Sequence, residues 1–122
     1  MTSKHDELLE QWEQNYKRGL LSFWILLALS EREMYAYEMG NEIRLLSQET
    51  IVADDNSIYR ALKRFADSGL VCSEQRPSEV GPPRRYFLLS DLGRTLLKQF
   101  IMRNLTVFQA PRVVKAMEQA AA

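Results

Sequence analysis

The segment from Asp54 to Gly93 constrains the fold of this 122-residue chain more than any other. It begins with a helix-like pattern, DDNSIYRALKRFADSGLV, and continues with two strand-like runs, VCSEQ and RRYFLL, and then SDLG. The runs are separated by RPSEVGPP, in which three prolines and a glycine cannot continue a strand or a helix. The segment therefore predicts a helix followed by a two-stranded hairpin with a long loop.

The predicted helix has a defined start, a defined end and two different faces. Asp54 is of a type that caps helices, Asp55 is favoured by the helix dipole in the first turn, and Gly69 is expected to close the helix. At about 100° per residue, the apolar face carries Ile58, Ala61, Leu62 and Phe65. The opposite polar face carries Asn56, Arg60 and Lys63, flanked by Tyr59 and Arg64.

This polar face has the side-chain chemistry of a helix that reads DNA. Asn and Arg near the start of a helix can bond the edges of adenine and guanine in a major groove, which points to Asn56 and Arg60, with Ser57 between them. Lys63 can bind a phosphate. Taken alone, however, the pattern fits an ordinary amphipathic surface helix equally well.

The loop between the two strands is bordered by arginines, at Arg76, Arg84 and Arg85. A basic hairpin tip can lie along the DNA backbone or enter the minor groove, where it contributes position and affinity more than sequence choice. An exposed polar hairpin without any nucleic-acid role is the alternative interpretation.

The charges of the chain are unevenly distributed, although they sum to zero. Residues 1–55 hold 5 basic and 11 acidic residues, whereas residues 56–103 hold 9 basic and 4 acidic residues. The basic region coincides with the predicted helix and hairpin. This coincidence favours an electrostatic footprint for double-stranded DNA over a merely solvated face.

Length and composition predict one domain that does not cross a membrane. The chain is 46% hydrophobic and 26% charged, and its long apolar run, Leu20 to Leu29, is too short to span a bilayer. Cys72 is the single cysteine, which excludes an internal disulfide and fits a reducing, cytoplasmic location. We expect Cys72 to be a small buried residue at the start of a strand.

Three helical patterns precede the predicted helix and hairpin. Apolar residues recur at helical spacing from Asp6 to Lys17, and Gly19 is expected to break this helix. The run that starts at Leu20 is apolar on nearly all sides, which predicts a buried helix. The pattern from Tyr35 to Leu46 predicts a third helix. Tyr37, Ile43 and Leu46 are expected to share one face of this helix, with Met39 or Met34 at its edge.

After the hairpin, Ser90 is expected to cap another long helix, which Pro111 ends or kinks. The predicted fold class is mainly α with a small two-stranded β wing, that is, a winged helix-turn-helix with added N- and C-terminal helices. The single domain has three expected parts. These are an N-terminal helix at 1–19, a DNA-binding core at 20–90 and a C-terminal dimerisation region at 91–122.

The chain resembles the PadR-like family of winged-helix transcriptional regulators over about Leu20 to Arg103. The recognition helix of that family has a Tyr, a Leu, a basic pair and a closing Gly-Leu-Val, found here at Tyr59, Leu62, Lys63, Arg64, Gly69, Leu70 and Val71. Its second wing strand and turn correspond here to Arg84, Arg85, Tyr86, Leu89, Ser90 and Gly93. MYAYEMGNEI is similar to the family's Gly-Tyr-Glu segment, with Ala36 in place of glycine.

The resemblance implies a dimeric repressor that binds a partly palindromic operator. One departure concerns the start of the recognition helix, where the family usually has Ser-x-Gly-Thr and this chain has Asp54, Asp55, Asn56 and Ser57. Carboxylates close to a phosphate backbone are repelled unless they cap the helix and point away. Base contacts by Asn56 and Ser57 therefore depend on where these two carboxylates point.

Terminal helices on both sides of the core are the expected dimer interface, because short members of the family dimerise through such helices. Both helices carry apolar stripes that a lone chain of this length does not need. The N-terminal stripe contains Leu8, Leu9, Trp12 and Tyr16, and the C-terminal one contains Leu96, Phe100, Leu105 and Phe108. A homodimer is therefore the expected assembly.

Enzymatic chemistry finds no support in the sequence. His5 is the single histidine, and the sequence contains no metal-ligand pair, phosphate loop or dinucleotide fingerprint, so no cofactor is expected. Trp12 and Trp24 are interpreted as core or interface residues and not as a platform for a small-molecule effector. The alternative function is a winged-helix dimer that binds protein partners without specific DNA binding.

Overall fold

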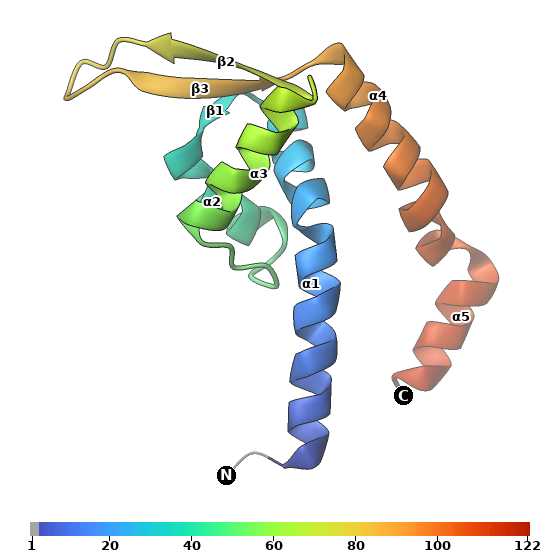
Figure 1. The fold of residues 1–122 in the computed structure, drawn as a ribbon. Coiled ribbons are helices and arrows are strands. Elements are labelled where there is room, and N and C mark those ends of the chain that lie inside the picture. The colour runs from blue at the N-terminus through green and yellow to red at the C-terminus, as the bar shows by residue number, and fades with distance from the viewer. Residues whose placement is uncertain (1–2) are drawn as a thin grey trace.

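A small sheet caps one end of a helical body in the computed structural model, which describes residues 3–122 (Figure 1). Its elements in chain order are α1 (Lys4–Glu31), β1 (Met34–Tyr35), α2 (Ala36–Leu46), α3 (Asp55–Asp67), β2 (Val71–Arg76), β3 (Arg84–Leu89), α4 (Asp91–Phe100) and α5 (Pro111–Ala120). A π-helical turn, Ile101–Leu105, and a 3₁₀ turn, Thr106–Gln109, join α4 to α5. Within the described residues, no helix is both long enough and apolar enough to cross a bilayer.

The core lies where the C-terminal half of α1 meets α2, α3 and the sheet. Its largest fully buried side chains are Ile25, Leu29, Met34, Met39, Ile43, Ile58 and Leu62. The predicted inner face of α3 is confirmed, since Ile58, Ala61, Leu62 and Phe65 are all buried. Packing on this one face fixes which face of α3 points to solvent.

The sheet is antiparallel, with strand order β1-β3-β2. The two strands of the predicted wing are β2 and β3, and the two-residue strand β1 is an addition that the sequence did not indicate. β1 pairs Met34 with Phe87 and Tyr35 with Tyr86. Two residues are too short for a strand periodicity, which explains why β1 was missed. The predicted fold class, a mainly α winged helix-turn-helix, is confirmed.

The expected break at Gly19 is wrong, because α1 continues through Gly19 without interruption and is 28 residues long in all. A glycine inside a helix costs only about 1 kcal/mol relative to alanine, and the residues on both sides favour helix. Packing of the downstream half of α1 in the core outweighs this cost. The boundary between the predicted parts 1–19 and 20–90 therefore lies inside one helix.

The inner face of α2 also differs from the sequence-based expectation. Met39 is fully buried, whereas Tyr37 is 77% exposed. The helix starts at Ala36, where the backbone N–H of Tyr35 donates a 3.1 Å hydrogen bond to Oε1 of Glu38, and Ala36, Met39 and Ile43 face the core. Tyr37 lies about 120° from Ile43 around the helix and cannot share its face.

One further expectation, that Cys72 is buried, was wrong. Cys72 is exposed, because side chains alternate along a strand and the preceding residue, Val71, takes the inward position. The expected end or kink at Pro111 is found: the helical run after Ser90 breaks at Ala110, which is extended, and Pro111 begins the short helix α5, where its missing N–H costs nothing.

Candidate nucleic-acid interface

The start of α3 is fixed by Asp54. The backbone N–H of Ser57 donates a 2.6 Å hydrogen bond to Oδ1 of Asp54. This bond holds the pKa of the Asp54 carboxyl below its ordinary value. The carboxylate is thus turned back to the helix N-terminus, as a capping role requires, and its charge is favoured by the helix dipole.

The exposed face of α3 carries the residues predicted from sequence. Asn56, Tyr59, Arg60, Lys63 and Arg64 are all exposed. Ser57 is half-buried, and its Oγ accepts a 3.4 Å hydrogen bond from Nη2 of Arg60. The predicted polar stripe is therefore a continuous solvent-facing strip of amide, hydroxyl and cationic groups.

The end of α3 positions the wing. Gly69 has a φ of 81°, a left-handed conformation that favours glycine, and the N–H of Leu70 bonds the carbonyl of Phe65 at 2.8 Å. The chain turns there directly into β2. The β2–β3 hairpin projects past α2 and α3 over the helical body (Figure 1).

A hollow of about 270 Å³ lies between α3 and the wing. Its lining comes from β1, α2, α3, β3 and the wing loop, and consists of Tyr35, Ala36, Tyr37, Asp55, Tyr59, Pro83, Arg84 and Arg85. The structure thus joins the α3 residue Tyr59 to the wing residues Arg84 and Arg85. Sequence reasoning missed Tyr35 and Tyr37. The sequence did indicate that Tyr37 is exposed, because its position around the helix is far from the core positions of α2.

The three wing arginines have different surroundings. Arg84 is exposed, with its guanidinium 4.6 Å from the centre of the Tyr35 ring. Arg85 is also exposed, and its Nη1 donates a 2.9 Å bond to Oγ of Ser73. Arg76 is half-buried at the base of the wing loop, where it forms ion pairs with Glu33 and Glu74. Two of the three predicted arginines therefore present exposed charge beside α3.

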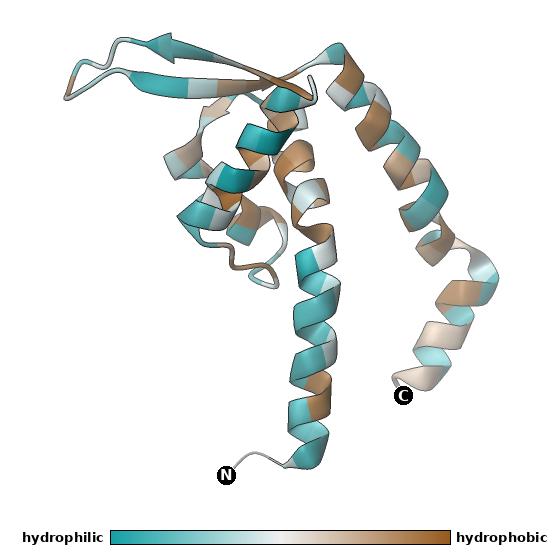
Figure 2. Ribbon diagram, in the orientation of Figure 1, coloured by the Kyte–Doolittle hydropathy of each residue, from teal (hydrophilic) through white to brown (hydrophobic). Residues whose placement is uncertain are grey.

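The predicted dimer stripes lie on the parts of the helices that extend away from the core. The N-terminal half of α1 projects from the body, and α4 and α5 form a second arm (Figures 1 and 2). Leu8, Leu9, Trp12 and Tyr16 are exposed on α1, and Leu96 and Phe108 are exposed on the second arm. Leu105 is half-buried. Phe100 is partly used inside the chain, since its ring lies 5.8 Å from that of Phe23 on α1.

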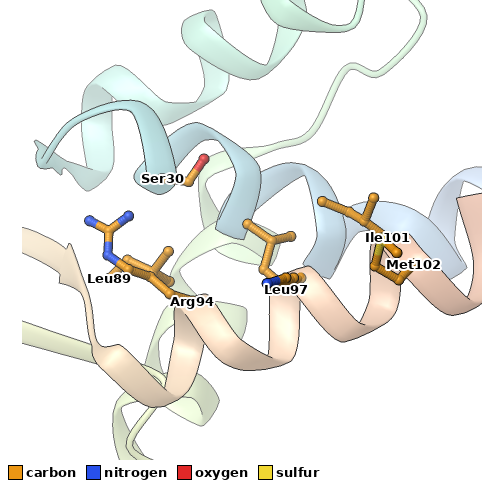
Figure 3. Close-up of a pocket in the computed structure, with 7 residues that line it drawn as sticks. Ser30, Leu89, Arg94, Leu97, Ile101 and Met102 are labelled. Carbon is orange, nitrogen blue, oxygen red and sulfur yellow. The ribbon is translucent and has the colours of Figure 1, made fainter. Parts of the chain in front are cut away.

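A second hollow, of about 240 Å³, lies between the end of α1 and α4 (Figure 3). It is lined by Ser30, Leu89, Arg94, Leu97, Lys98, Ile101 and Met102. Neither tryptophan contributes to it. Trp24 packs edge-on against Phe23 with ring centres 5.1 Å apart, and Trp12 lies on the projecting half of α1.

Comparison with known proteins decides the family. Residues 25–99, more than half of the chain, match the model of the transcriptional regulator PadR-like family. The chain belongs to this family. PadR-like proteins are transcriptional regulators and not enzymes. No curated protein sequence matches the chain.

Solved structures similar to this PadR-like chain share its fold. A PadR family transcriptional regulator from Eggerthella lenta has a TM-score of 0.74 at 24% identity, over 93% of this chain and 96% of that chain. A transcriptional regulator from Streptococcus has a TM-score of 0.64 at 28% identity, over 80% and 94%. PadR of Bacillus subtilis, in complex with operator DNA, has a TM-score of 0.64 at 21% identity, over 70% of this chain and 47% of that chain.

Proposed function

We propose that this PadR-like regulator is a cytoplasmic homodimeric repressor that binds a partly palindromic operator in double-stranded DNA. The helix at 54–69 enters the major groove, and the wing at 76–85 lies on the backbone or in the minor groove. The observation that carries this proposal is the exposed polar strip on α3, whose flanking residue Tyr59 lines the same hollow as the exposed wing residues Arg84 and Arg85.

The side chains of α3 divide into two roles under this proposal. Asn56 and Arg60 lie in the first two turns of the helix and contact base edges, with Ser57 and Tyr59 beside them. Lys63 and Arg64 lie further along α3 and bind phosphates, as do the wing arginines. The capping position of Asp54 supports this division, because its carboxylate is bonded to the helix N-terminus.

The homodimer is supported by the two apolar arms. Their exposed side chains, among them Trp12 and Phe108, find no cover within the described chain. Exposed apolar stripes of this kind mark interaction surfaces in soluble proteins. A twofold dimer places its two recognition helices about one DNA turn, roughly 34 Å, apart, which matches a palindromic site.

Fluorescence anisotropy tests the proposal. The purified protein is titrated into a labelled promoter fragment from upstream of its own gene, with a scrambled duplex as competitor, at two salt concentrations. Tight, salt-sensitive binding that the scrambled duplex does not displace is the expected result. Weak and equal binding to both duplexes, followed by failure of a random-sequence selection to enrich any site, contradicts specific DNA binding.

A further inference from the structure

Backbone pairing joins the wing to the rest of the protein over only a short stretch. β1 pairs with β3 only as far as Tyr86, at the Tyr35–Tyr86 pair. Beyond it, the pairs Gln75–Arg85 and Arg76–Arg84 join β2 to β3 without a third strand. An isolated two-stranded ribbon is only marginally stable in water, so the outer wing needs other contacts to keep its direction.

Arg76 supplies such a contact from the outermost residue of β2. Its guanidinium makes a two-pronged ion pair with the carboxylate of Glu33, in which Nη2 lies 2.9 Å from Oε2. Glu33 lies in the turn between α1 and β1, 43 residues away in sequence. Nε of Arg76 also donates a 2.7 Å bond to Glu74. A two-pronged guanidinium–carboxylate pair fixes orientation as well as distance.

Aromatic contacts extend this attachment across the sheet. The guanidinium of Arg76 lies 4.6 Å from the centre of the Tyr86 ring. Tyr86 meets Tyr35 edge-on, with ring centres 5.6 Å apart, and Arg84 covers Tyr35 at 4.6 Å. These contacts form a row of four side chains. The row runs from Arg76 at the outer end of β2, through Tyr86 on β3 and Tyr35 on β1, to Arg84 at the start of β3.

We infer that Arg76 is a positioning residue, which together with Glu33 sets the direction of the wing relative to α3 so that Arg84 and Arg85 reach DNA. Arg76 is close to two carboxylates, so its charge is already offset and little of it is left for a phosphate. This inference rests on the proposed DNA-binding function. It changes the role expected for Arg76 from contacting DNA to holding the residues that do.

The direction in which one substitution changes DNA affinity distinguishes a positioning role of Arg76 from direct contact with DNA. Glu33→Gln removes a negative charge near the interface and releases Arg76. If Arg76 can contact DNA, binding tightens and the salt slope steepens by roughly 0.9 for the added phosphate contact. If Arg76 positions the wing, binding to the selected operator weakens by at least about fivefold, the lower end of typical coupling between sites, without a steeper slope.

Glu31→Gln is the matched control, because Glu31 is an exposed acid at the end of α1, two residues from Glu33 and outside the wing, and forms no ion pair among residues 3–122. It is expected to leave affinity unchanged or slightly higher. A double-mutant cycle then asks through which residues Glu33 acts. In an Arg84→Ala/Arg85→Ala background, Glu33→Gln is expected to have no further effect on affinity, and a full additive effect contradicts the inference.

Hydrogen exchange of the full chain without DNA gives a second measurement. Glu33→Gln is expected to speed exchange of the backbone amides of Gln75 and Arg85 and to leave those of α3 unchanged. Unchanged exchange in the outer wing overturns the anchoring role, even if DNA binding is intact. Conversely, faster wing exchange in a protein that selects no DNA site overturns the proposed function and, with it, the purpose assigned to Arg76.

Discussion

At the scale of single residues, Asp54 and Arg60 show how the proposed interface holds an acidic side chain at the start of its recognition helix. The Asp54 carboxylate accepts the N–H of Ser57, and the Arg60 guanidinium, which bonds the Ser57 hydroxyl, lowers the pKa of Asp54 further. Asp55, by contrast, lines the hollow beside the wing. Any repulsion of DNA by the DDNS sequence is therefore expected to come from Asp55 more than from Asp54.

The division of roles on α3 predicts different effects for two neighbouring cations. Arg60→Ala is expected to weaken binding to the preferred operator by about 1–3 kcal/mol and to relax specificity at one base position. Lys63→Ala is expected to weaken binding to all sequences alike and to reduce the salt slope by about 1. Anisotropy titrations of both variants on matched and mismatched duplexes, at several salt concentrations, measure this. Equal effects of both substitutions on all duplexes contradict the division.

Substitution of Gly93 by a larger residue is expected to destabilise the fold strongly. A Cβ built at Gly93 would lie 2.2 Å from the carbonyl oxygen of Leu70 and 2.6 Å from Cδ1 of Leu89. Gly93→Ala is therefore expected to destabilise the fold by about 1–3 kcal/mol, because α4 must move away from the backbone of Leu70 and from Leu89 at the end of β3. Urea unfolding followed by circular dichroism measures the change.

Gly19→Ala is the matched control for Gly93→Ala. Gly19 lies inside α1, and a Cβ there meets no atom within 4 Å. This substitution is expected to stabilise the chain by up to about 1 kcal/mol, since alanine favours the helix interior. If both variants were equally destabilised, close approach at Gly93 would not be the cause.

At the scale of elements, local patterns predicted most of the fold. The faces of α3 follow from helical spacing, and the two wing strands follow from composition and from the proline-rich loop between them. Other features depend on contacts between distant residues. These are the continuity of α1, the short strand β1 and the pairing of Arg76 with Glu33. Spacing along the chain carries no information on a contact across 43 residues.

The N-cap of α3 predicts a pH dependence of stability. Because the folded pKa of Asp54 is below its ordinary value, its cap stabilises the fold fully above the unfolded pKa of about 3.9. This contribution is lost as pH falls through the lower, folded pKa. Asp54→Ala is therefore expected to lower the thermal midpoint at pH 7 and to change it less at pH 2. A constant difference between the two proteins across this range contradicts the assignment.

At the scale of the whole molecule, the surface proposed for dimer assembly and the surface proposed for DNA binding lie on different parts of the chain. The α3 face and the wing lie around the core, whereas the N-terminal half of α1 and the α4–α5 arm extend beyond it (Figure 1). α5 packs mainly on the 3₁₀ turn that precedes it. Substitutions on the arms are thus expected to change dimerisation without altering the α3 surface.

Substitution of Trp12 tests how strongly an arm residue contributes to dimerisation. It is 73% exposed in the single chain, so Trp12→Ala is expected to leave folding of one chain intact. Buried interface tryptophans typically contribute 2 kcal/mol or more, which corresponds to a roughly 30-fold weaker dimer. Sedimentation velocity at micromolar concentration, with the exposed neighbour Gln11→Ala as the control, measures the shift to monomer. A wild-type protein that is only monomeric under these conditions contradicts the homodimer.

The exposed side chain of Cys72 gives the molecule a built-in attachment point for a probe. It is the single thiol of the chain and lies on β2, at the base of the wing and opposite Leu88. A maleimide dye or a nitroxide can therefore be attached there without prior removal of other cysteines. In a twofold assembly, one such label per subunit reports a single wing-to-wing distance, which turns operator binding into a change that electron spin resonance or energy transfer can follow.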